Sequence, residues 1–257
     1  MPDRPSELAD FIAATIRQQV ESAGTVTKHG EPLVGFVAAD DPRFGDLCRL
    51  AEPTHMLPEE LLAGARSVVS FFLPFEAKVV EANTKSRMSV AREWAVAYVE
   101  TNALIGRVTS RLISELAQRG VQAAAEPATG NFDPVTLVSR WSHKSIAVLA
   151  GLGSFGLHHM VITDAGCAGR LGSLVVDAEL PAVTLQVKER CLYFKDGSCL
   201  ECVMRCPVGA LDAEGNLDKQ RCWVRCQEVA KEFEEVGVAE VCGKCVIGPC
   251  ALQSAVD

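Results

Sequence analysis

Cysteine is concentrated in the C-terminal part of this chain. The sequence holds 11 cysteines in 257 residues, and most of them follow one readable pattern near the C-terminus. Eight thiolates are enough to hold two four-iron clusters, and short spacers let consecutive cysteines reach adjacent corners of one cluster. The pattern therefore predicts a protein that carries single electrons. Its members are Cys191, Cys199, Cys202, Cys206, Cys222, Cys242, Cys245 and Cys250.

The spacing also predicts how two clusters would share these ligands. The run Cys199-x2-Cys202-x3-Cys206 is followed by Pro207. In bacterial two-cluster ferredoxins the cysteine before such a proline binds the other cluster. Cys226 lies one helical turn after Cys222, so either of the two could be the ligand. We expect one cluster to use Cys191, Cys199, Cys202 and Cys250, and the other to use Cys206, Cys222, Cys242 and Cys245.

Zinc is the alternative metal for such a tail. Zinc ribbons use separate Cys-x2-Cys knuckles, and the run from Cys199 to Cys206 fits two such pairs poorly. Residues 1–7 show no basic region followed by an apolar stretch, so we expect a cytoplasmic chain whose thiols stay reduced rather than a disulfide framework. Two further cysteines, Cys48 and Cys167, are more typical of small buried side chains, although Cys167 lies in a glycine-rich turn.

Composition limits the class of protein further. No run of eighteen apolar residues suggests a membrane span. The net charge of −8 disfavours a nucleic-acid surface, which needs basic residues to replace the counterions of phosphate. We therefore expect no membrane partner, and a nucleic-acid partner is disfavoured without being excluded.

Hydrophobic periodicity predicts an α/β fold (in the broad sense that includes α+β) over residues 1–185, and a second, cysteine-rich domain over residues 186–257. The polar stretch from 181 to 190 marks the boundary. The apolar stripe on the longest helix suits either core packing or a homodimer interface. Segment 146–150 is compatible with helix or strand. Helices are predicted at 6–20, 58–62 and 89–118, and strands at 34–38, 67–73, 161–163 and 171–176.

A glycine turn interrupts the first domain. The segment Gly151-Leu152-Gly153-Ser154-Phe155-Gly156 matches the G-x-G-x-x-G pattern of dinucleotide sites, and Asp177 falls where a ribose-binding acid would be. The segment after the turn is short and strand-like, with little room for the crossover helix that such a site needs. We therefore favour close approach of another large planar cofactor, with a purely structural turn as the alternative.

These segments together resemble a known family. Residues 147–156, the pair Ile162-Thr163, residues 166–174 and the double-cluster tail are similar to epoxyqueuosine reductases and related cobalamin-binding iron–sulfur proteins. The resemblance implies a nitroreductase-like N-terminal domain that holds cobalamin, and a ferredoxin-like C-terminal domain whose two [4Fe–4S] clusters feed electrons to cobalt. It favours Cys222 over Cys226 as the ligand. It also implies that Gly151, Gly153, Phe155, Gly156 and Gly172 lie against the corrin.

The chain departs from the family pattern in two places. The family carries an acidic proton donor in a stretch before the long helix, and nothing here matches that stretch; Glu93, Glu100 and Asn102 are merely nearby, so the catalytic residue is unassigned. Where the family has Gly-Lys-Asn after the glycine turn, this chain has two histidines. His158 could ligate cobalt or donate a proton, whereas the role of His159 is open. Together with the acidic balance of the chain, these departures predict a substrate other than epoxyqueuosine in tRNA.

The expected function is a redox protein that receives electrons from an unidentified donor protein and passes them through two [4Fe–4S] clusters to a bound corrinoid. That cofactor would act on a small-molecule substrate, and Arg170 is a candidate contact for a phosphate or propionamide. Two alternatives are kept open. One is a ferredoxin-like carrier without an organic cofactor, and the other is a flavin-dependent reductase.

Overall fold

A four-stranded antiparallel sheet forms the centre of the molecule. The computed structural model describes residues 4–50, 54–182 and 188–256. The strand order is β1-β2-β6-β3, so chain neighbours β1 and β2 pair directly and β6 returns between β2 and β3. Strand β2 is buried at every position, in keeping with its mainly apolar sequence, and its two serines, Ser67 and Ser70, are buried as well. The strands are β1 (Leu33–Ala38), β2 (Ser67–Pro74), β3 (Ala123–Ala124) and β6 (Gly169–Val176).

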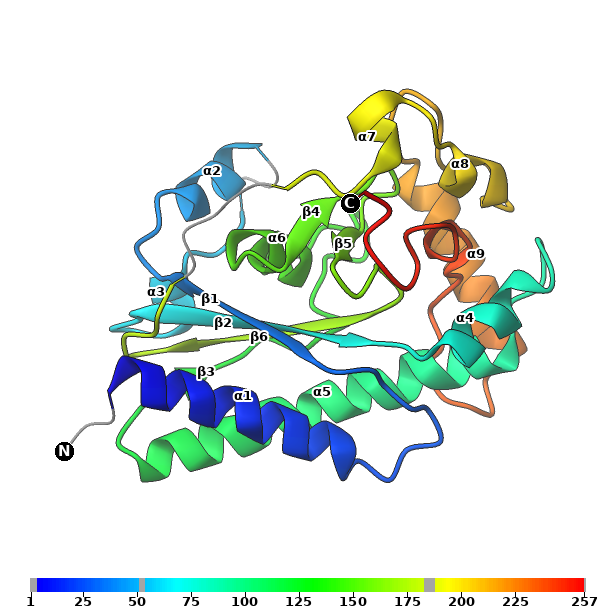
Figure 1. Cartoon of the computed structure of the whole chain (residues 1–257). Coiled ribbons are helices and arrows are strands. Elements are labelled where there is room, and N and C mark those ends of the chain that lie inside the picture. The colour runs from blue at the N-terminus through cyan, green and yellow to red at the C-terminus, as the bar shows by residue number, and fades with distance from the viewer. Residues whose placement is uncertain (1–3, 51–53, 183–187, 257) are drawn as a thin grey trace.

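Helices cover both faces of this sheet (Figure 1). On one face, α1 (Pro5–Glu21) packs against α5 (Arg92–Gln118), whose apolar stripe lies on the sheet. The stripe is thus core, and it supplies no homodimer interface. On the other face lie α6 (His143–Leu149) and the hairpin of β4 (Gly153–Phe155) and β5 (Val161–Thr163). The ambiguous segment 146–150 is therefore mainly helical.

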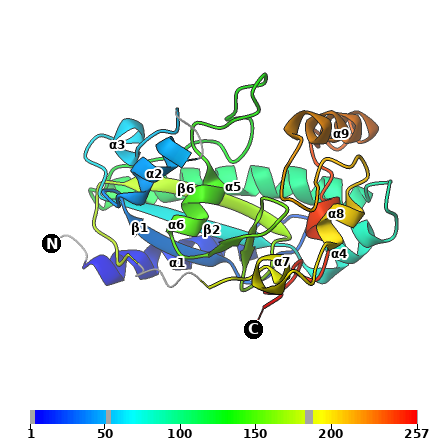
Figure 2. The ribbon, with the colours of Figure 1, turned by 90° about the horizontal axis from the view of Figure 1, so that it is seen from above.

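The cysteine-rich tail is built from short helices joined by loops. It packs at one end of the sheet, against α4 (Ala77–Thr84) and the start of α5 (Figure 2). One hydrophobic cluster joins Val79 and Trp94 of the first part to Val229 and Phe233 of the tail. The tail elements are α7 (Leu192–Asp196), α8 (Glu201–Arg205), α9 (Lys219–Glu232) and a 3-10 turn, η1 (Lys244–Val246).

The predicted elements agree well with this architecture, and the mixed α/β class is confirmed. The small strand expected at Ala210-Leu211 is reduced to one isolated bridge, between Leu211 and Leu217. Two helices near the first domain's edge, α2 (Arg43–Leu50) and α3 (Pro58–Leu61), complete the fold. Part of the predicted boundary, 183–187, lies outside the described residues, so the division at 185/186 stays a prediction. Among the described helices, none combines the length and apolarity needed to cross a bilayer.

Candidate functional site

The four cysteines predicted to bind one of the two clusters, Cys191, Cys199, Cys202 and Cys250, converge on one small hollow. Cys191 precedes α7, Cys202 lies in α8, and both side chains are buried. Burial, and then the nearby Cys250, raise the pKa of Cys202 to about 11. Crowded thiolates repel one another in this way unless a cation lies between them, which suits a metal site. The hollow is lined by Cys191, Cys199, Cys202 and Cys250, with Leu157, Ile162 and Pro249 on its apolar walls.

Cys250 is held by two groups from the first part of the chain. The Sγ of Cys167 lies 3.7 Å from the Sγ of Cys250, and the Nε2 of His158 lies 3.5 Å from it. The backbone N–H of Met160 donates to His158 Nδ1 at 3.1 Å, so the neutral ring carries its proton on Nε2 and donates to Cys250. The Cys167 thiol and His158 hold the pKa of Cys250 down, to about 5. Both contacts favour the thiolate, which is the form that binds iron.

His158 was predicted to ligate cobalt or donate a proton. In the structure both of its ring nitrogens are engaged, one by Met160 and the other by Cys250. It therefore contacts a candidate cluster ligand, and its role toward a cofactor stays a prediction. His159 turns elsewhere, with its Nε2 2.9 Å from the carbonyl oxygen of Gly215 in the tail. The two histidines thus fasten the β4–β5 hairpin to the cysteine-rich tail.

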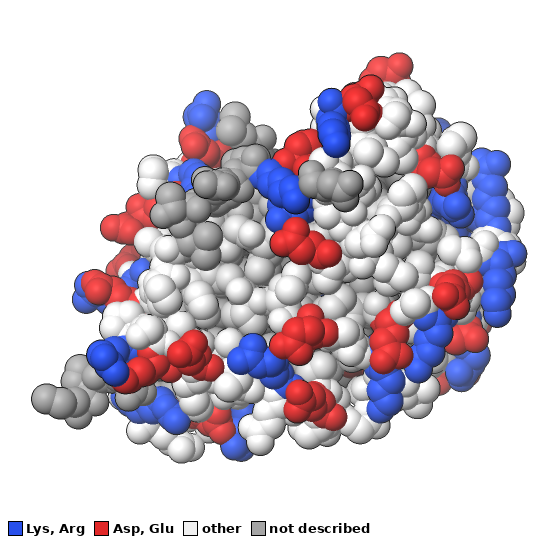
Figure 3. Space-filling view, viewed as in Figure 1, with Lys and Arg blue, Asp and Glu red and all other residues white. Residues whose placement is uncertain are grey.

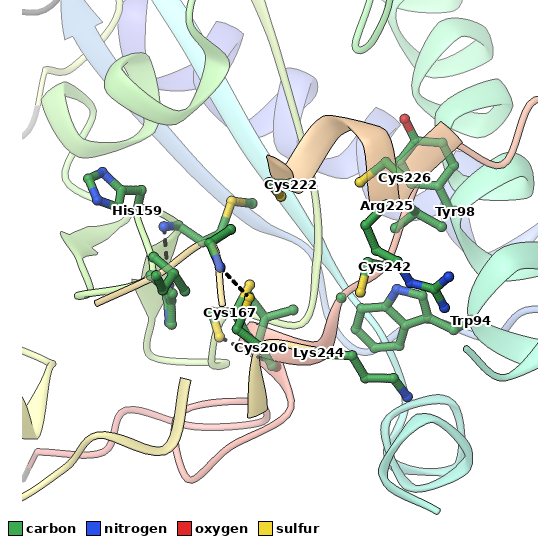
Figure 4. Close-up of a pocket in the computed structure, with 18 of the residues that line it drawn as sticks. Trp94, Tyr98, His159, Cys167, Cys206, Cys222, Arg225, Cys226, Cys242 and Lys244 are labelled. Carbon is green, nitrogen blue, oxygen red and sulfur yellow. Dashed lines mark hydrogen bonds between the residues drawn. The ribbon is translucent and has the colours of Figure 1, made fainter. Parts of the chain in front are cut away.

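The second group of cysteines forms a wall of the largest cavity near the tail, about 380 Å³ in volume (Figure 4). The backbone N–H of Ala210 donates to Cys206 Sγ at 3.2 Å, which is an N–H···S contact of the kind that tunes cluster ligands. Cys245 lines both this cavity and the small hollow, so the two candidate sites adjoin. The cysteines in this wall are Cys206, Cys222, Cys226, Cys242 and Cys245, and Cys167 lies on the cavity as well.

Cys222 and Cys226 lie one turn apart on α9 and therefore face the same way. A hydrogen bond from Cys226 lowers the pKa of Cys222 to about 7, whereas that bond and burial raise the pKa of Cys226. Both side chains line the large cavity, so their positions do not choose between them. Cys222 stays the predicted ligand on the resemblance.

A buried lysine fixes the loop that carries Cys242 and Cys245. Lys244 is 1% exposed, and its Nζ donates to Asn83 O at 2.6 Å, Asn83 Oδ1 at 2.7 Å and Ser86 O at 2.9 Å. Asn83 also donates from Nδ2 to the carbonyl of Cys242 at 3.2 Å. The end of α4 therefore holds both sides of the ligand loop. The sequence gives no sign of this support for the ligand loop, because Lys244 and Asn83 are 161 positions apart.

Two buried donors beside this loop lack a partner among the described residues. They are the indole N–H of Trp94 and the Nε–H of Arg225, and both side chains line the large cavity near Cys242 (Figure 4). Buried donors are normally satisfied, so an acceptor is expected there. Cluster sulfur and cysteine sulfur are such acceptors. The convergent thiols and orphan donors together fit an iron–sulfur cluster at this place.

The glycines predicted to touch a corrin have packing roles in this structure. His158 lines the large cavity, and Met160 lines both this cavity and a neighbouring one of about 290 Å³. Neither these glycines nor Phe155 are among the described residues that line the two cavities. A Cβ on Gly153 would lie 2.2 Å from the carbonyl oxygen of Ile162 in the paired strand β5. A Cβ on Gly172 would lie 2.4 Å from the Phe71 ring. Gly151 has a φ of 78° after α6, and Gly156 packs on Ile162 and His158.

The dinucleotide interpretation of the glycine turn is wrong. The sheet is antiparallel, and the turn leads from α6 into the β4–β5 hairpin rather than from a strand into a helix. Asp177 Oδ1 accepts from the backbone N–H of Gln122 at 2.8 Å. The residues considered near the long helix as proton donors are placed as follows. The Glu100 carboxylate accepts hydrogen bonds from the backbone N–H groups of Val26 and Thr27. Neither Glu93, Glu100 nor Asn102 is among the described residues that line the large cavity.

Comparison with known proteins places this arrangement in context. No family model matches the chain. An epoxyqueuosine reductase of Salmonella typhimurium is 30% identical over 212 residues, covering 80% of this chain and 51% of that protein. The Escherichia coli epoxyqueuosine reductase is 31% identical over 170 residues, covering 64% and 41%. The chain is a relative of the epoxyqueuosine reductases. It spans about half the length, or less, of these curated relatives.

Solved structures share the fold. An epoxyqueuosine reductase crystallised with an epoxyqueuosine-modified tRNA stem loop matches with a TM-score of 0.60 and 18% identity, covering 95% of this chain and 66% of that one. A catabolic reductive dehalogenase matches with a TM-score of 0.63 and 13% identity, covering 100% and 33%. The resemblance to the epoxyqueuosine reductases is confirmed. The comparisons give no support to the expectation that nucleic acid is not a partner.

Proposed function

We propose that this chain is an iron–sulfur redox enzyme that passes electrons through two [4Fe–4S] clusters to a corrinoid in the large cavity. One observation carries the proposal: the wall of that cavity is formed by the predicted ligands of the second cluster. A group bound there would touch the cluster environment directly. Cys245 borders both sites, so electrons would cross a short distance from the Cys191 cluster.

The neighbours support the choice of cofactor. One structural neighbour, with a TM-score of 0.58 and 13% identity, is a reductive dehalogenase whose structure suggests a mechanism for B12-dependent dehalogenation. A bound corrinoid would supply low-valent cobalt as a strong nucleophile. The chain's own residues would position the clusters and tune their potentials. Cys167 and His158 stabilise the Cys250 thiolate, and Lys244 holds the Cys242–Cys245 loop. The tail would then serve as a ferredoxin-like unit on a nitroreductase-like domain.

The experiment is anaerobic reconstitution with iron and sulfide, followed by hydroxocobalamin and gel filtration. We expect about eight irons per chain and cobalt that elutes with the protein. Zinc without acid-labile sulfide would overturn the cluster assignment. Cobalt left in the small-molecule fraction would favour the ferredoxin-like carrier, and a yellow chromophore released by acid would favour the flavin reductase.

Crossed ligation is tested by Cys206→Ala. This variant should lose about four irons from the site shared with Cys222, Cys242 and Cys245, while the electron paramagnetic resonance signal of the other cluster stays. Cys48→Ala is the matched control, because Cys48 contacts only Phe44 and His55 oxygens among the described residues. Unchanged iron in Cys206→Ala would contradict the crossed pairing.

We further propose that the substrate is a small molecule rather than tRNA. The net charge is −8, and acidic and basic residues are interspersed over most of the face seen in Figure 3, with several basic residues along its right edge. A negative net charge disfavours extended phosphate contacts, which need basic residues to replace counterions. The reconstituted protein, given reductant and an epoxyqueuosine-containing tRNA stem loop, should leave the epoxide intact. Formation of queuosine would show that the chain shares the activity named for its relatives.

A further inference from the structure

An arginine that has no acidic partner among the described residues borders both cavities. Arg170, in β6, lines the large cavity and the neighbouring one. Its Nε donates to Asn102 Oδ1 at 2.9 Å, and its guanidinium carbon lies 4.6 Å from the centre of the Tyr98 ring. Asn102 and Tyr98 both belong to α5, so this helix fixes the position of the Arg170 side chain. No hydrogen bond or ion pair to its two terminal nitrogens is found among the described residues, and burial lowers its pKa.

Other basic groups gather at the same place. Lys144 also lines both cavities, and its Nζ donates to the carbonyl oxygen of His159 at 3.1 Å. After burial, repulsion from neighbouring cations that include Arg170 lowers the pKa of Lys144. The described lining of the smaller cavity contains no aspartate or glutamate, and that of the larger contains Glu240 as its acidic residue. Cys222 and Cys245 on the large cavity offset part of the repulsion felt by Lys144. The terminal nitrogens of Arg170 still have no acceptor among the described residues, and a buried cation that lacks one is costly unless a ligand supplies it.

We propose that Arg170, with Lys144 beside it, forms an anion site that binds a carboxylate or phosphate group within the cavity. Guanidinium groups recognise both anions through paired N–H donors, and the two terminal nitrogens of Arg170 are available for this. This inference rests on the proposed function, because it describes the ligand of the same cavity. The anion has two sources with shared chemistry: a small organic acid as substrate, or the phosphate in the nucleotide tail of a cobalamin.

The site is tested by equilibrium binding to the cluster-loaded chain before any corrinoid is added. The probes are benzoate and inorganic phosphate, with neutral benzamide as the reference. Arg170→Gln should weaken binding of at least one anion about tenfold or more, as expected for a charge-assisted hydrogen bond, and should leave benzamide unchanged. Arg170→Lys should retain part of the affinity. Arg107→Gln, on the exposed face of α5, is the matched control and should behave as the natural chain.

The source of the anion is separated in a second arm. Hydroxocobalamin carries the phosphate, whereas cobinamide has the corrin ring without the nucleotide tail. If Arg170→Gln weakens cobalamin and spares cobinamide, the phosphate of the cofactor occupies the site; if both corrinoids bind as before while benzoate is lost, a substrate carboxylate does. Equal binding of every probe by the natural chain and by Arg170→Gln would overturn the proposal. Failure of both corrinoids to bind the natural chain would contradict the proposed function instead, while the anion measurements still decide this site.

Discussion

The indole of Trp94 occupies the space beside Gly243 where any other residue would place its side chain. A Cβ built on Gly243 would lie 2.2 Å from Trp94 Nε1, and the φ of Gly243 is 72°. Helix α5 thereby reaches into the ligand loop between Cys242 and Cys245. Packing and backbone conformation both require glycine at this point.

We expect Gly243→Ala to damage the second cluster selectively. The new methyl group would displace Trp94 or the loop, and the left-handed backbone adds about 1 kcal/mol of strain. Iron should fall by about four per chain, with the signal of the other cluster retained. The control is Gly106→Ala on the same helix, where a Cβ would meet nothing within 4 Å. Full iron content in Gly243→Ala would show that the loop tolerates the displacement.

The orphan donors predict a shift in redox potential. An N–H donated to cluster sulfur stabilises the reduced, more negative state, so its loss should lower the potential. Trp94→Phe and Arg225→Met remove one donor each and should lower the midpoint of the second cluster by several tens of millivolts, about 40 mV for each kcal/mol of differential stabilisation. Potentiometric titration followed by paramagnetic resonance measures this.

Trp223→Phe is the control for that series. Trp223 packs edge-on against Phe132, and it is not among the described residues that line the cavity. Its substitution should leave both midpoints in place. A midpoint in Trp94→Phe and Arg225→Met equal to that of the natural chain would show that these donors do not reach the cluster.

The thiol pair on α9 should respond asymmetrically to serine. Cys222→Ser should remove about four irons, because Cys222 is the predicted ligand of the pair. Cys226→Ser should keep all the iron, since a hydroxyl can still donate to Cys222. Elemental analysis with sulfide determination separates the two variants. The reverse pattern of loss would identify Cys226 as the ligand.

A buried histidine should make the fold acid-sensitive. His143 Nδ1 lies 2.8 Å from Ser173 Oγ and its Nε2 lies 3.0 Å from Pro127 O, an arrangement suited to the neutral ring. Burial lowers the pKa of His143 to about 4, below its ordinary 6.5. As the pH falls from 6.5 toward 4, His143 is protonated in the unfolded chain but stays neutral in the folded chain. The free energy of unfolding therefore decreases over this range. The loss between pH 7 and pH 5 is about 2 kcal/mol in the free energy of unfolding.

Anaerobic denaturant unfolding at the two pH values checks this expectation. His143→Gln removes the titrating ring, so its free energy of unfolding should change less between pH 7 and pH 5 than that of the natural chain. The comparison between the two proteins cancels the acid sensitivity of the clusters themselves. If the free energy of unfolding fell equally in both proteins, His143 would not be the cause of the loss of stability at low pH.

Local patterns in the chain were sufficient for much of the architecture. The mainly apolar run 67–73 predicts a buried strand, and the helical stripe from Trp94 to Leu116 predicts a packed helix, because side-chain spacing follows the geometry of each element. The cysteine spacing likewise predicts two groups of four, and the two hollows contain those groups. The G-x-G-x-x-G pattern taken alone would indicate a dinucleotide site, but a short pattern does not specify the pairing of the strands around it.

The partners of the site depend instead on how distant segments pack. Cys167 meets Cys250 across 83 positions, Lys244 meets Asn83 across 161, and Arg170 meets Asn102 across 68. Spacing along the chain holds no information about such contacts, because they arise when the tail packs on α4 and α5. Candidate metal ligands can thus be picked out from their spacing in the sequence, whereas the donors and cations around these cysteines are set by the three-dimensional packing.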